Sequence, residues 1–335
     1  MRAWQLPAGS DGFDKLYLTK LPDPTPGPGE VLIAPKAWSI NYRDFAVAAG
    51  KYFGGVLKAP AIPLSDGAGV VVSVGEGVTA FQPGDKVQGS FFLDWLGGPQ
   101  RMSRAMGDGT APGMLAELVV LPAQAVVKIA ERYSFAQAAC MPCAGVTAWN
   151  ALTHGGRPAG AGSRVLVLGS GGVSLIALAL AKALGAEVIA TSSSDEKLSR
   201  VQALGAAQLV NYKTTPEWGA HIAKEFGGAN KVIEVGGVGT LPQSIAALAP
   251  EGEIALIGVL TDGEPPHPRG LMMTGGSIRG IFVGSVEMAR ELNAFVDEHG
   301  VDPAIGATFS FDDVPAAYAH AWGSDSFGKT VITLD

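Results

Sequence analysis

The sequence contains few charged residues and has no excess of positive charge. Only 16% of its 335 residues are charged, whereas 47% are hydrophobic. This composition excludes a disordered chain, because disorder requires low hydrophobicity and high net charge. Lys and Arg (24) are outnumbered by Asp and Glu (31), so the positive charge that drives binding to a phosphate backbone is missing. We therefore expect no nucleic-acid partner.

Long apolar runs and a set of cysteines are also missing. The longest nearly apolar stretch, Val173 to Ala181, ends at Lys182, well short of the ~20 residues of a membrane-spanning helix. The first residues carry no long apolar segment with a cleavage site after it. Two cysteines, Cys140 and Cys143, make no disulfide framework. These features predict a cytoplasmic protein with no membrane partner.

Glycine is abundant, and its positions divide the chain into two kinds of segment. There are 46 glycines in 335 residues, roughly twice the ~7% average. Up to about residue 128, short β-segments such as 30–34 and 69–74 alternate with Pro and Gly turns. This pattern is typical of a compact all-β barrel or sandwich.

From residue 129 the pattern changes to continuous apolar segments that alternate with helical ones. Such an alternation indicates a parallel sheet covered on both faces, and the right-handed crossover rule makes it a doubly wound domain. The predicted strands are 165–168, 187–191, 208–211, 231–235 and 253–257, and the predicted helices are 172–184, 195–204, 217–226 and 241–249. Residues 269–335 return to mixed strands with an amphipathic helix near 286–299.

A glycine turn joins the strand at 165–168 to a helix rich in Ala and Leu. Gly169 permits the tight turn, Gly171 lets the backbone approach a pyrophosphate, and the helix N-terminus offers N–H donors. The third motif position is Ser174, which still allows close packing of helix on strand. This context predicts dinucleotide binding, with a purely structural turn as the alternative. The residues predicted to bind are Gly169, Ser170, Gly171, Gly172 and Val173.

The end of the next strand favours NADPH over NADH. An NAD site usually has Asp or Glu about 20 residues after the loop, to bind the ribose 2′-hydroxyl. Here residues 191–197 read TSSSDEK, so the strand ends without a carboxylate that would repel a 2′-phosphate. Lys197 could supply a matching cation, and the hydroxyls of Ser192 and Ser193 could donate hydrogen bonds. Ser194 also suits a helix N-cap, and both interpretations are compatible.

Three further residues follow predicted strands. Gly236 comes after the strand at 231–235, and Gly258 and Val259 come after the strand at 253–257. The carboxyl ends of parallel strands form the edge where the cofactor lies. We therefore expect the backbone of these residues to approach the ribose or the nicotinamide.

Several segments together resemble the medium-chain dehydrogenase/reductase superfamily, in its zinc-independent, quinone-oxidoreductase-like (zeta-crystallin-like) branch. The most specific are 41–44 (NYRD) with Tyr52, 66–71 (DGAGVV), 74–78, 81–87, 143–149 (CAGVTAW) and the glycine loop. The resemblance covers essentially the whole chain. It implies an α/β protein with a GroES-like β-barrel catalytic domain at 1–128 and a Rossmann domain with a parallel sheet at 129–268. A return segment at 269–335 would complete the sheet edge and the catalytic domain.

The resemblance also implies cofactor and subunit contacts. In similar NADPH-dependent quinone reductases, a Lys after the second strand and a Tyr fifteen residues later hold the 2′-phosphate, and Lys197 and Tyr212 have this spacing. By the same analogy, the backbone of Phe282 and Val283 would bind the carboxamide, and Lys329 would reach toward the phosphates. The strand at 277–283 resembles the edge strand through which such proteins dimerise, so we expect a homodimer.

The positions of the catalytic zinc ligands in similar alcohol dehydrogenases read Asn41, Ser65 and Cys143 here. Zinc takes Cys, His or carboxylate ligands, so one thiol with Asp66 nearby makes a weak site. Residues 88–120 also lack the four cysteines of a structural zinc lobe. We expect no metal.

Without a Lewis acid, the reaction that fits is hydride addition to the β-carbon of an enone or quinone. Charge then develops on a remote oxygen, which an N–H or O–H donor can stabilise. In similar zinc-free reductases, the residues that match Asn41 and Tyr52 face the nicotinamide cleft. The resemblance therefore implies that Asn41 and Tyr52 are the candidate catalytic residues. Tyr52 would donate a hydrogen bond or a proton, and Asn41 would orient the oxygen; the alternatives are a pocket wall and a helix cap. Arg43 stands where zinc enzymes carry a proton-relaying Ser or Thr. This difference argues against a proton relay for the oxidation of an alcohol.

Three functions follow, in decreasing order of support. The first is a zinc-independent, NADPH-dependent oxidoreductase that reduces a small enone, quinone or related carbonyl compound. The second is an alcohol dehydrogenase of the same superfamily, and the third is an NADPH-binding protein without turnover. The sequence does not predict which substrate is used.

Overall fold

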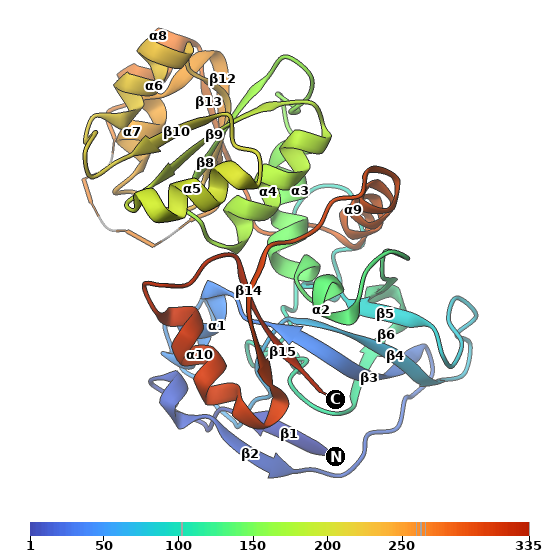
Figure 1. The fold of residues 1–335 in the computed structure, drawn as a ribbon. Coiled ribbons are helices and arrows are strands. Elements are labelled where there is room, and N and C mark those ends of the chain that lie inside the picture. Colours follow the sequence, from blue (N-terminus) through green and yellow to red (C-terminus); the bar gives the residue numbers. More distant parts are fainter. Residues whose placement is uncertain (102, 259, 262, 265, 335) are drawn as a thin grey trace. The chain divides into compact units, whose positions relative to one another are not determined.

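The computed structural model describes residues 1–101, 103–258, 260–261, 263–264 and 266–334, and the chain forms two compact units (Figure 1). Unit 1 comprises Met1–Val146, Gly284–Gly300 and Ile305–Asp335, and unit 2 comprises Thr147–Val283 and Val301–Ala304. The domain ranges 1–128, 129–268 and 269–335 stay a prediction. Within the described part of the chain, no helix is long and apolar enough to cross a membrane.

Unit 2 is built on a parallel sheet of six strands in the order β10-β9-β8-β11-β12-β13. The strands are β8 (Arg164–Leu168), β9 (Glu187–Ser192), β10 (Gln208–Asn211), β11 (Ala229–Glu234), β12 (Leu248–Leu256) and β13 (Ser277–Gly280). In chain order this is the 3-2-1-4-5-6 arrangement of a doubly wound fold. The predicted α/β fold class is confirmed.

Helices flank this sheet (Figure 1). They are α4 (Gly172–Ala183), α5 (Asp195–Ala203), α6 (Trp218–Phe226), α7 (Leu241–Ala246) and α8 (Arg269–Thr274). α4 and α5 pack on the β8–β10 half, and α7 and α8 on the β11–β12 half. Burial on both faces is why the strands are continuous apolar runs such as Val165 to Leu168.

Two sequence-based element boundaries in unit 2 are wrong. The helix predicted at 241–249 ends at Ala246, because Leu248 already pairs with Ala229 as the first residue of β12. An apolar run shared by a helix end and a strand start gives no periodicity signal at the junction. The strand predicted at 277–283 ends at Gly280, where its pairing with Leu256 of β12 stops.

Unit 1 contains a mostly antiparallel sheet of seven strands, in the order β14-β15-β3-β4-β5-β7 with β6 paired to β3. The strands are β3 (Glu30–Ser39), β4 (Asp66–Val74), β5 (Lys86–Gly89), β6 (Val119–Pro122), β7 (Val126–Lys128), β14 (Ile305–Ser310) and β15 (Lys329–Thr333); β1 (Arg2–Gln5) and β2 (Tyr17–Lys20) form a separate pair. Its helices are α1 (Tyr42–Ala48), α2 (Phe135–Ala138), α9 (Val286–His299) and α10 (Val314–Trp322). α9 spans the helix predicted at 286–299, begins at the N-cap Ser285 and ends at Gly300 in the left-handed conformation.

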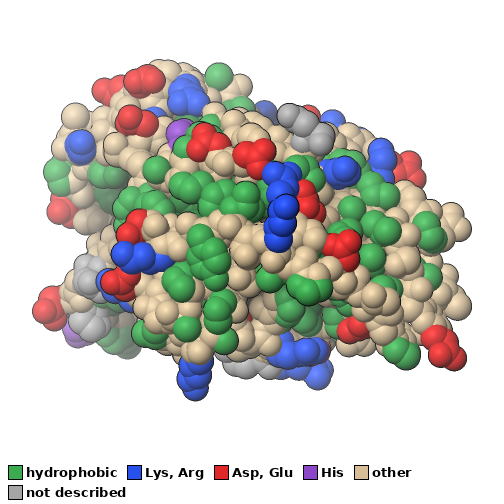
Figure 2. Space-filling view, turned by 90° about the horizontal axis from the view of Figure 1, so that it is seen from below, with side chains coloured by type: hydrophobic (Ala, Val, Ile, Leu, Met, Phe, Trp, Pro, Cys, Tyr) green, Lys and Arg blue, Asp and Glu red, His purple; other side chains and the backbone are tan. Residues whose placement is uncertain are grey.

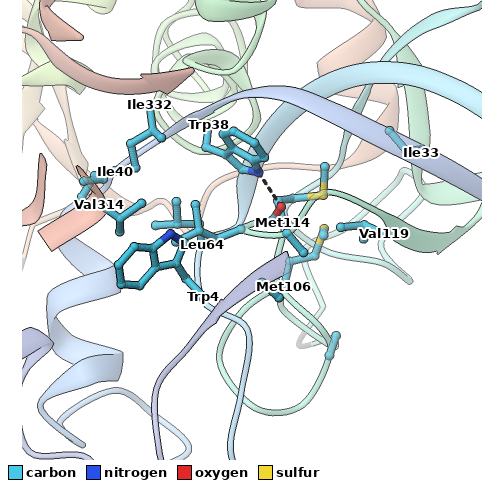
Figure 3. Packing of buried hydrophobic residues seen from close by; sticks show 14 of the residues in the cluster. Trp4, Ile33, Trp38, Ile40, Leu64, Met106, Met114, Val119, Val314 and Ile332 are labelled. Carbon is cyan, nitrogen blue, oxygen red and sulfur yellow. Dashed lines mark hydrogen bonds between the residues drawn. The ribbon is translucent and has the colours of Figure 1, made fainter. Parts of the chain in front are cut away.

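The core of unit 1 is packed from strands and loops far apart in the sequence (Figure 3). Trp38, from β3, is fully buried, and its indole N–H donates to the carbonyl of Met114. Trp4, Leu64 and Ile332 belong to the same cluster. A buried indole needs such a partner, because an unpaired buried N–H is costly.

The surface carries charges of both signs. On the face drawn in Figure 2, described Lys and Arg side chains are interspersed with Asp, Glu and apolar ones. This distribution agrees with the net charge of −7, and this face offers no basic stripe of the kind that follows a nucleic-acid backbone.

Candidate active site

The turn from β8 to α4 in unit 2 has the backbone of a dinucleotide-binding loop. β8 ends at Leu168, and Gly169 follows with φ of +72°, a left-handed conformation that glycine adopts without steric cost. Ser174, near the start of α4, donates through its hydroxyl to the Leu168 carbonyl (2.6 Å). The serine at the third motif position therefore fastens the helix to the strand.

The space beside this loop is open. A Cβ built on Gly169 or Gly171 would meet no atom within 4 Å apart from its chain neighbours. Gly171 is the N-cap of α4 and provides no side-chain hydrogen bond, so the first N–H groups and the helix dipole can serve an anion. A pyrophosphate fits this loop. The predicted residues of the turn and the first helical turn are Gly169, Ser170, Gly171, Gly172 and Val173.

The residues predicted to hold a 2′-phosphate lie together at the carboxyl ends of β9 and β10. The N–H of Tyr212 donates to the carbonyl of Ser192 (3.0 Å). Ser194 is the N-cap of α5, and its hydroxyl accepts the N–H of Lys197 (3.3 Å). Ser193 lies between β9 and this cap. The structure thus brings these residues to one edge of the sheet.

The first acid after β9 is engaged within the protein. Asp195 Oδ1 accepts a hydrogen bond from Nδ2 of Asn211 (2.7 Å), the last residue of β10. β9 itself ends at Ser192, so no carboxylate stands at the strand end where a ribose-binding acid is usual.

Gly236 and Gly258 lie just beyond β11 and β12, as predicted, but packing within the protein already accounts for both. A Cβ on Gly258 would lie 1.7 Å from the carbonyl oxygen of Val235, and one on Gly236 would lie 2.3 Å from Oγ1 of Thr240. Their contact with a cofactor stays a prediction. Val259, the third residue predicted there, lies outside the described residues.

The sequence interpretation missed Glu234, which organises this same edge. The carboxylate is fully buried at the end of β11. It accepts hydrogen bonds from the N–H groups of Gly236 (2.8 Å) and Gly237 (3.0 Å), and from the hydroxyls of Thr240 (2.6 Å) and Ser244. The available signal was an acid at the end of the apolar segment Val232–Ile233.

Phe282 and Val283 follow β13, and the backbone is strained there. Val283 has φ of +54°, which is rare for a β-branched residue and costs about 1–3 kcal/mol. Its carbonyl accepts a hydrogen bond from Nδ2 of Asn150 (2.7 Å). Strain of this kind clusters at functional sites, which supports the predicted role of this segment without testing it.

In unit 1, a buried polar cluster gathers where β3, α1, β4 and β15 meet. Nζ of Lys329 donates to the carbonyl of Ile40 (2.7 Å) and to Oδ1 of Asn41 (2.5 Å), and lies 4.0 Å from Oδ2 of Asp66. The side chains of Lys329 and Asp66 are 3% and 0% exposed. The resemblance implied that Lys329 reaches toward phosphates; the structure instead engages its ammonium group inside unit 1.

Asp66 is the centre of this cluster. The hydroxyls of Ser39 (3.1 Å) and Ser65 (2.8 Å) donate to its carboxylate. Burial raises the pKa of the Asp66 carboxyl group, and Lys329 and the hydrogen bonds oppose that shift.

The residues at the zinc-ligand positions do not fit a metal. Asn41 Oδ1 accepts from Lys329 and the Ser65 hydroxyl donates to Asp66. Cys143 is buried, and burial raises the pKa of its thiol, which disfavours the thiolate that binds zinc. Across the described ranges, no three His, Cys, Asp or Glu side chains are grouped so that they could hold a metal ion.

Tyr52 presents a buried hydroxyl group that has no hydrogen-bond partner among the described residues. The guanidinium of Arg43 lies over its ring, with Cζ 4.6 Å from the ring centroid. Burial raises the pKa of Tyr52 to about 12, and the Arg43 charge opposes the shift. Tyr52 therefore suits a neutral hydrogen-bond donor better than a proton donor.

Asn41 lies at the start of α1. Its N–H donates to Oδ2 of Asp44 (2.8 Å), and burial raises the pKa of that carboxyl group to about 6. Nδ2 of Asn41 is buried and has no hydrogen-bond partner in the described part of the chain. Asn41 thus links the helix start to Lys329, while its contact with substrate stays a prediction.

Two family models match this chain. Residues 27–131 match the alcohol dehydrogenase GroES-like domain, and residues 172–298 match the zinc-binding dehydrogenase family. A zinc-type alcohol dehydrogenase-like protein from Schizosaccharomyces pombe is 43% identical over 339 residues, which cover 97% of this chain and 96% of that protein. The chain belongs to the medium-chain dehydrogenase/reductase superfamily. The predicted GroES-like and Rossmann architecture is confirmed.

Other members of the superfamily similar to this chain differ in the activity that their names state. A 2-methylene-furan-3-one reductase from Solanum lycopersicum is 30% identical over 308 residues, covering 90% of this chain and 71% of that protein. A solved structure of an NAD-dependent alcohol dehydrogenase is 32% identical, covers all of both chains and has a TM-score of 0.90. The chain is an oxidoreductase with a nicotinamide-cofactor fold and a small-molecule substrate.

Proposed function

We propose that this chain is an NADPH-dependent reductase that works without a metal and adds hydride to an enone, a quinone or a related carbonyl compound. The observation that carries the proposal is the cluster around Asn41. The three zinc-ligand positions offer an amide, a hydroxyl and a buried thiol, and the ammonium group of Lys329 lies 4.0 Å from the neighbouring carboxylate of Asp66. A metal ion beside that ammonium group would be repelled.

This site suits a substrate that needs no Lewis acid. A nicotinamide, when bound, supplies a hydride. As the new C–H bond forms at the β-carbon, the C=C electron pair shifts and the carbonyl oxygen gains negative charge, until a proton from water reaches the α-carbon. Tyr52 donates a hydrogen bond to that oxygen, because its raised pKa keeps the hydroxyl group protonated. Asn41 orients the same oxygen through Nδ2.

NADPH is proposed because the edge of unit 2 offers donors and a cation but no strand-end carboxylate. Ser192, Ser193, Lys197 and Tyr212 would hold the 2′-phosphate, and Asp195 is engaged by Asn211. The glycine loop after β8 would hold the pyrophosphate. The relative of 32% identity that is named NAD-dependent makes NADH the alternative to be measured.

A substrate panel tests the proposal. The purified protein is assayed by NADPH absorbance with cyclohexenone and benzoquinone, and with the saturated ketone cyclohexanone as the matched control. We expect at least tenfold faster turnover with the enone or quinone, no effect of EDTA, and substoichiometric zinc by mass spectrometry. Stoichiometric zinc, or equal turnover of the saturated ketone, would contradict the proposal.

Alcohol dehydrogenase is the second candidate, because the names of similar proteins and of one matching family favour it. Cyclohexanol with NADP⁺ or NAD⁺ is the assay that separates it. Oxidation of the alcohol faster than reduction of cyclohexenone would select this function. NADPH binding without consumption of any panel member would instead point to a protein without turnover.

We also propose a homodimer formed through β13. This strand pairs with β12 on one side and is the last strand of the sheet, and an exposed strand edge readily pairs with another. Light scattering should give twice the chain mass of 34.3 kDa. A mass of one chain would contradict this assembly.

A further inference from the structure

Arg43, in the first turn of α1, is a buried charge with unused donors. The residue is 8% exposed. Its Nη1 donates to the carbonyl of Met106 (2.8 Å) and to Oδ1 of Asp44 (3.2 Å). Nε and Nη2 are also buried, and neither has a hydrogen-bond partner among the described residues. Buried donors are normally paired, so two unpaired nitrogens on one guanidinium require an explanation.

Two aromatic rings fix the orientation of this guanidinium. Its Cζ lies 4.6 Å from the ring centroid of Tyr52 and 5.2 Å from that of Phe91. These cation–π contacts place the positive charge of Arg43 over both rings. The hydroxyl group of Tyr52 is buried as well, and no described residue forms a hydrogen bond of ordinary geometry with it. Arg43 and Tyr52 therefore lie in contact, and together they carry three buried donor atoms without a well-formed hydrogen bond among the described residues.

The acidic neighbours do not use these donors. Asp44 contacts only Nη1, and it also accepts the N–H of Asn41. Asp108 Oδ1 accepts the N–H and the hydroxyl of Thr110. The charge of Arg43 is thus compensated at Nη1, and no carboxylate of a described residue forms a hydrogen bond with Nε or Nη2.

The loop that carries Tyr52 reaches the surface. Phe53 is 76% exposed, and its ring centroid lies 5.0 Å from that of Tyr52. Tyr52 therefore lies directly beside an exposed aromatic residue.

We propose that Arg43 and Tyr52 together form an oxyanion site. The site binds a substrate oxygen that carries no hydrogen and becomes negatively charged. This oxygen accepts hydrogen bonds from Nε and Nη2 of Arg43 and from the hydroxyl of Tyr52. In the reaction, which rests on the proposed function, this is the oxygen of the enolate or quinol anion formed when hydride from NADPH adds to the substrate. The hydride pair forms the new bond, the π pair moves toward the oxygen, and water supplies the proton. Charged donors strengthen as that charge develops, so Arg43 performs the electrostatic role that a metal has in zinc-dependent relatives.

Substitution of Arg43 tests the proposal in the complete protein with NADPH bound. Arg43→Gln should lower kcat for cyclohexenone about 100-fold, as loss of an oxyanion donor does, with the KM and the Kd for NADPH changed by less than about twofold. Arg43→Lys keeps the charge but not the planar set of donors, and should lose about tenfold in kcat. Arg104→Gln is the matched control, because Arg104 pairs with Asp94 at an exposed site of the same unit. A kcat within about threefold of wild type for Arg43→Lys and for any folded Arg43→Gln protein would overturn the proposal.

Benzoate separates failure of this inference from failure of the proposed function. Its carboxylate matches the donor set and its ring matches the aromatic surroundings. If the wild-type protein reduces no member of the panel, the proposed reaction fails, and calorimetry with benzoate decides about the site alone. We expect binding by the wild type and Arg104→Gln, and at least tenfold weaker binding by Arg43→Gln or Arg43→Lys. No binding by the wild type, or equal binding by the Arg43 variants, would overturn the anion site.

Discussion

The candidate site of unit 2 is formed by backbone groups, whereas that of unit 1 is formed by side chains. The loop after β8 in unit 2 works through its backbone, with Gly169 in a left-handed conformation, open space at Gly171 and the N–H groups of α4. The cluster in unit 1 works through side chains, of which Lys329 and Asp66 are fully buried. A site made of backbone depends on space, whereas a site made of buried polar side chains depends on every partner.

Because of this difference, substitutions at the two sites should have different effects, one on cofactor binding and the other on the stability of the fold. A Cβ added at Gly171 in the glycine loop would lie in the space of a ligand and meet no other atom within 4 Å apart from its chain neighbours. A side chain removed from the cluster of unit 1 leaves a buried partner unpaired, which is a large cost to the folded state. Substitutions at Gly171 in the glycine loop should therefore alter cofactor affinity, and those in the buried cluster around Asp66 should alter the free energy of unfolding.

The largest effect should come from Lys329→Met. This change removes the cation 4.0 Å from Asp66 and the donor to Asn41 Oδ1. Breaking a buried ion pair costs about 3–5 kcal/mol, and we expect urea denaturation to show a loss near the lower end, about 3 kcal/mol. Lys128→Met is the control, because Lys128 is 61% exposed beside Asp85 and exposed pairs contribute less than about 1 kcal/mol. Equal losses in the two variants would contradict the assignment of the large effect to the buried pair of Lys329 and Asp66.

Gly171→Val should abolish cofactor binding and leave stability unchanged. The valine side chain would occupy the open space at the N-terminus of α4, so the Kd for NADPH should rise at least about 100-fold, or about 2.7 kcal/mol. Fluorescence titration measures this change, and circular dichroism should show an unchanged fold. Gly160→Val is the matched control, since a Cβ there also meets open space but lies outside the loop. NADPH affinity like that of the wild type would place the pyrophosphate elsewhere.

The pH dependence of the free energy of unfolding should show the contribution of Asp44 in unit 1. Its pKa is raised to about 6 by burial, against ~3.9 for an unperturbed Asp. The folded state therefore holds the proton more tightly, and this contribution to stability is lost as the pH rises from about 4 to about 6. Relative to wild type, Asp44→Asn should gain about 2 kcal/mol in free energy of unfolding between pH ~4 and pH ~7.

A control of opposite sign is available in the same unit. Arg104 lowers the pKa of Asp94 through their side-chain hydrogen bonds, so Asp94 stabilises the folded state when ionised. Asp94→Asn should therefore become less stable relative to wild type as the pH rises to about 4, and the difference should stay constant above that pH. The same slope in both variants would contradict the assignment of the Asp44 shift to burial.

The smallest effect tests the choice between NADPH and NADH. Lys197→Ala should raise the Kd for NADPH about tenfold and the Kd for NADH less than about twofold, because only NADPH carries the 2′-phosphate. Lys224→Ala removes another lysine of unit 2, paired with Glu225, and should change neither affinity. Equal losses for both cofactors in Lys197→Ala would put the phosphate contact elsewhere.

The sequence predicted unit 2 in some detail because its signals are local. The strand at 165–168, the glycine turn and the helix that begins at Gly172 are adjacent in the chain, and each carries its own pattern. Errors arose where no local signal exists, as at Leu248, which continues the apolar run of α7 but pairs with β11. Glu234 was missed because its role depends on how the following loop folds back.

The site of unit 1 could be predicted only in outline. Resemblance drew attention to Asn41 and Tyr52 and to the missing zinc ligands. The contact of Lys329 with Asn41 spans 288 residues of sequence, and no periodicity reports such a pairing. The unused donors of Arg43 and the raised pKa of Tyr52 both arise from burial, which the sequence alone does not measure.

At Glu234, at the end of β11, the length of the side chain and the number of hydrogen bonds it accepts matter more than its charge. One carboxylate oxygen accepts from two N–H groups and the Thr240 hydroxyl, and the other, among the described residues, accepts only from the Ser244 hydroxyl. A hydroxyl group can turn and become an acceptor, whereas a peptide N–H cannot. Glutamine could therefore take this place, with its amide donating to Ser244, while aspartate would fall one methylene short. A neutral side chain would then keep the loop in shape and remove a negative charge from the edge where an anionic dinucleotide is expected.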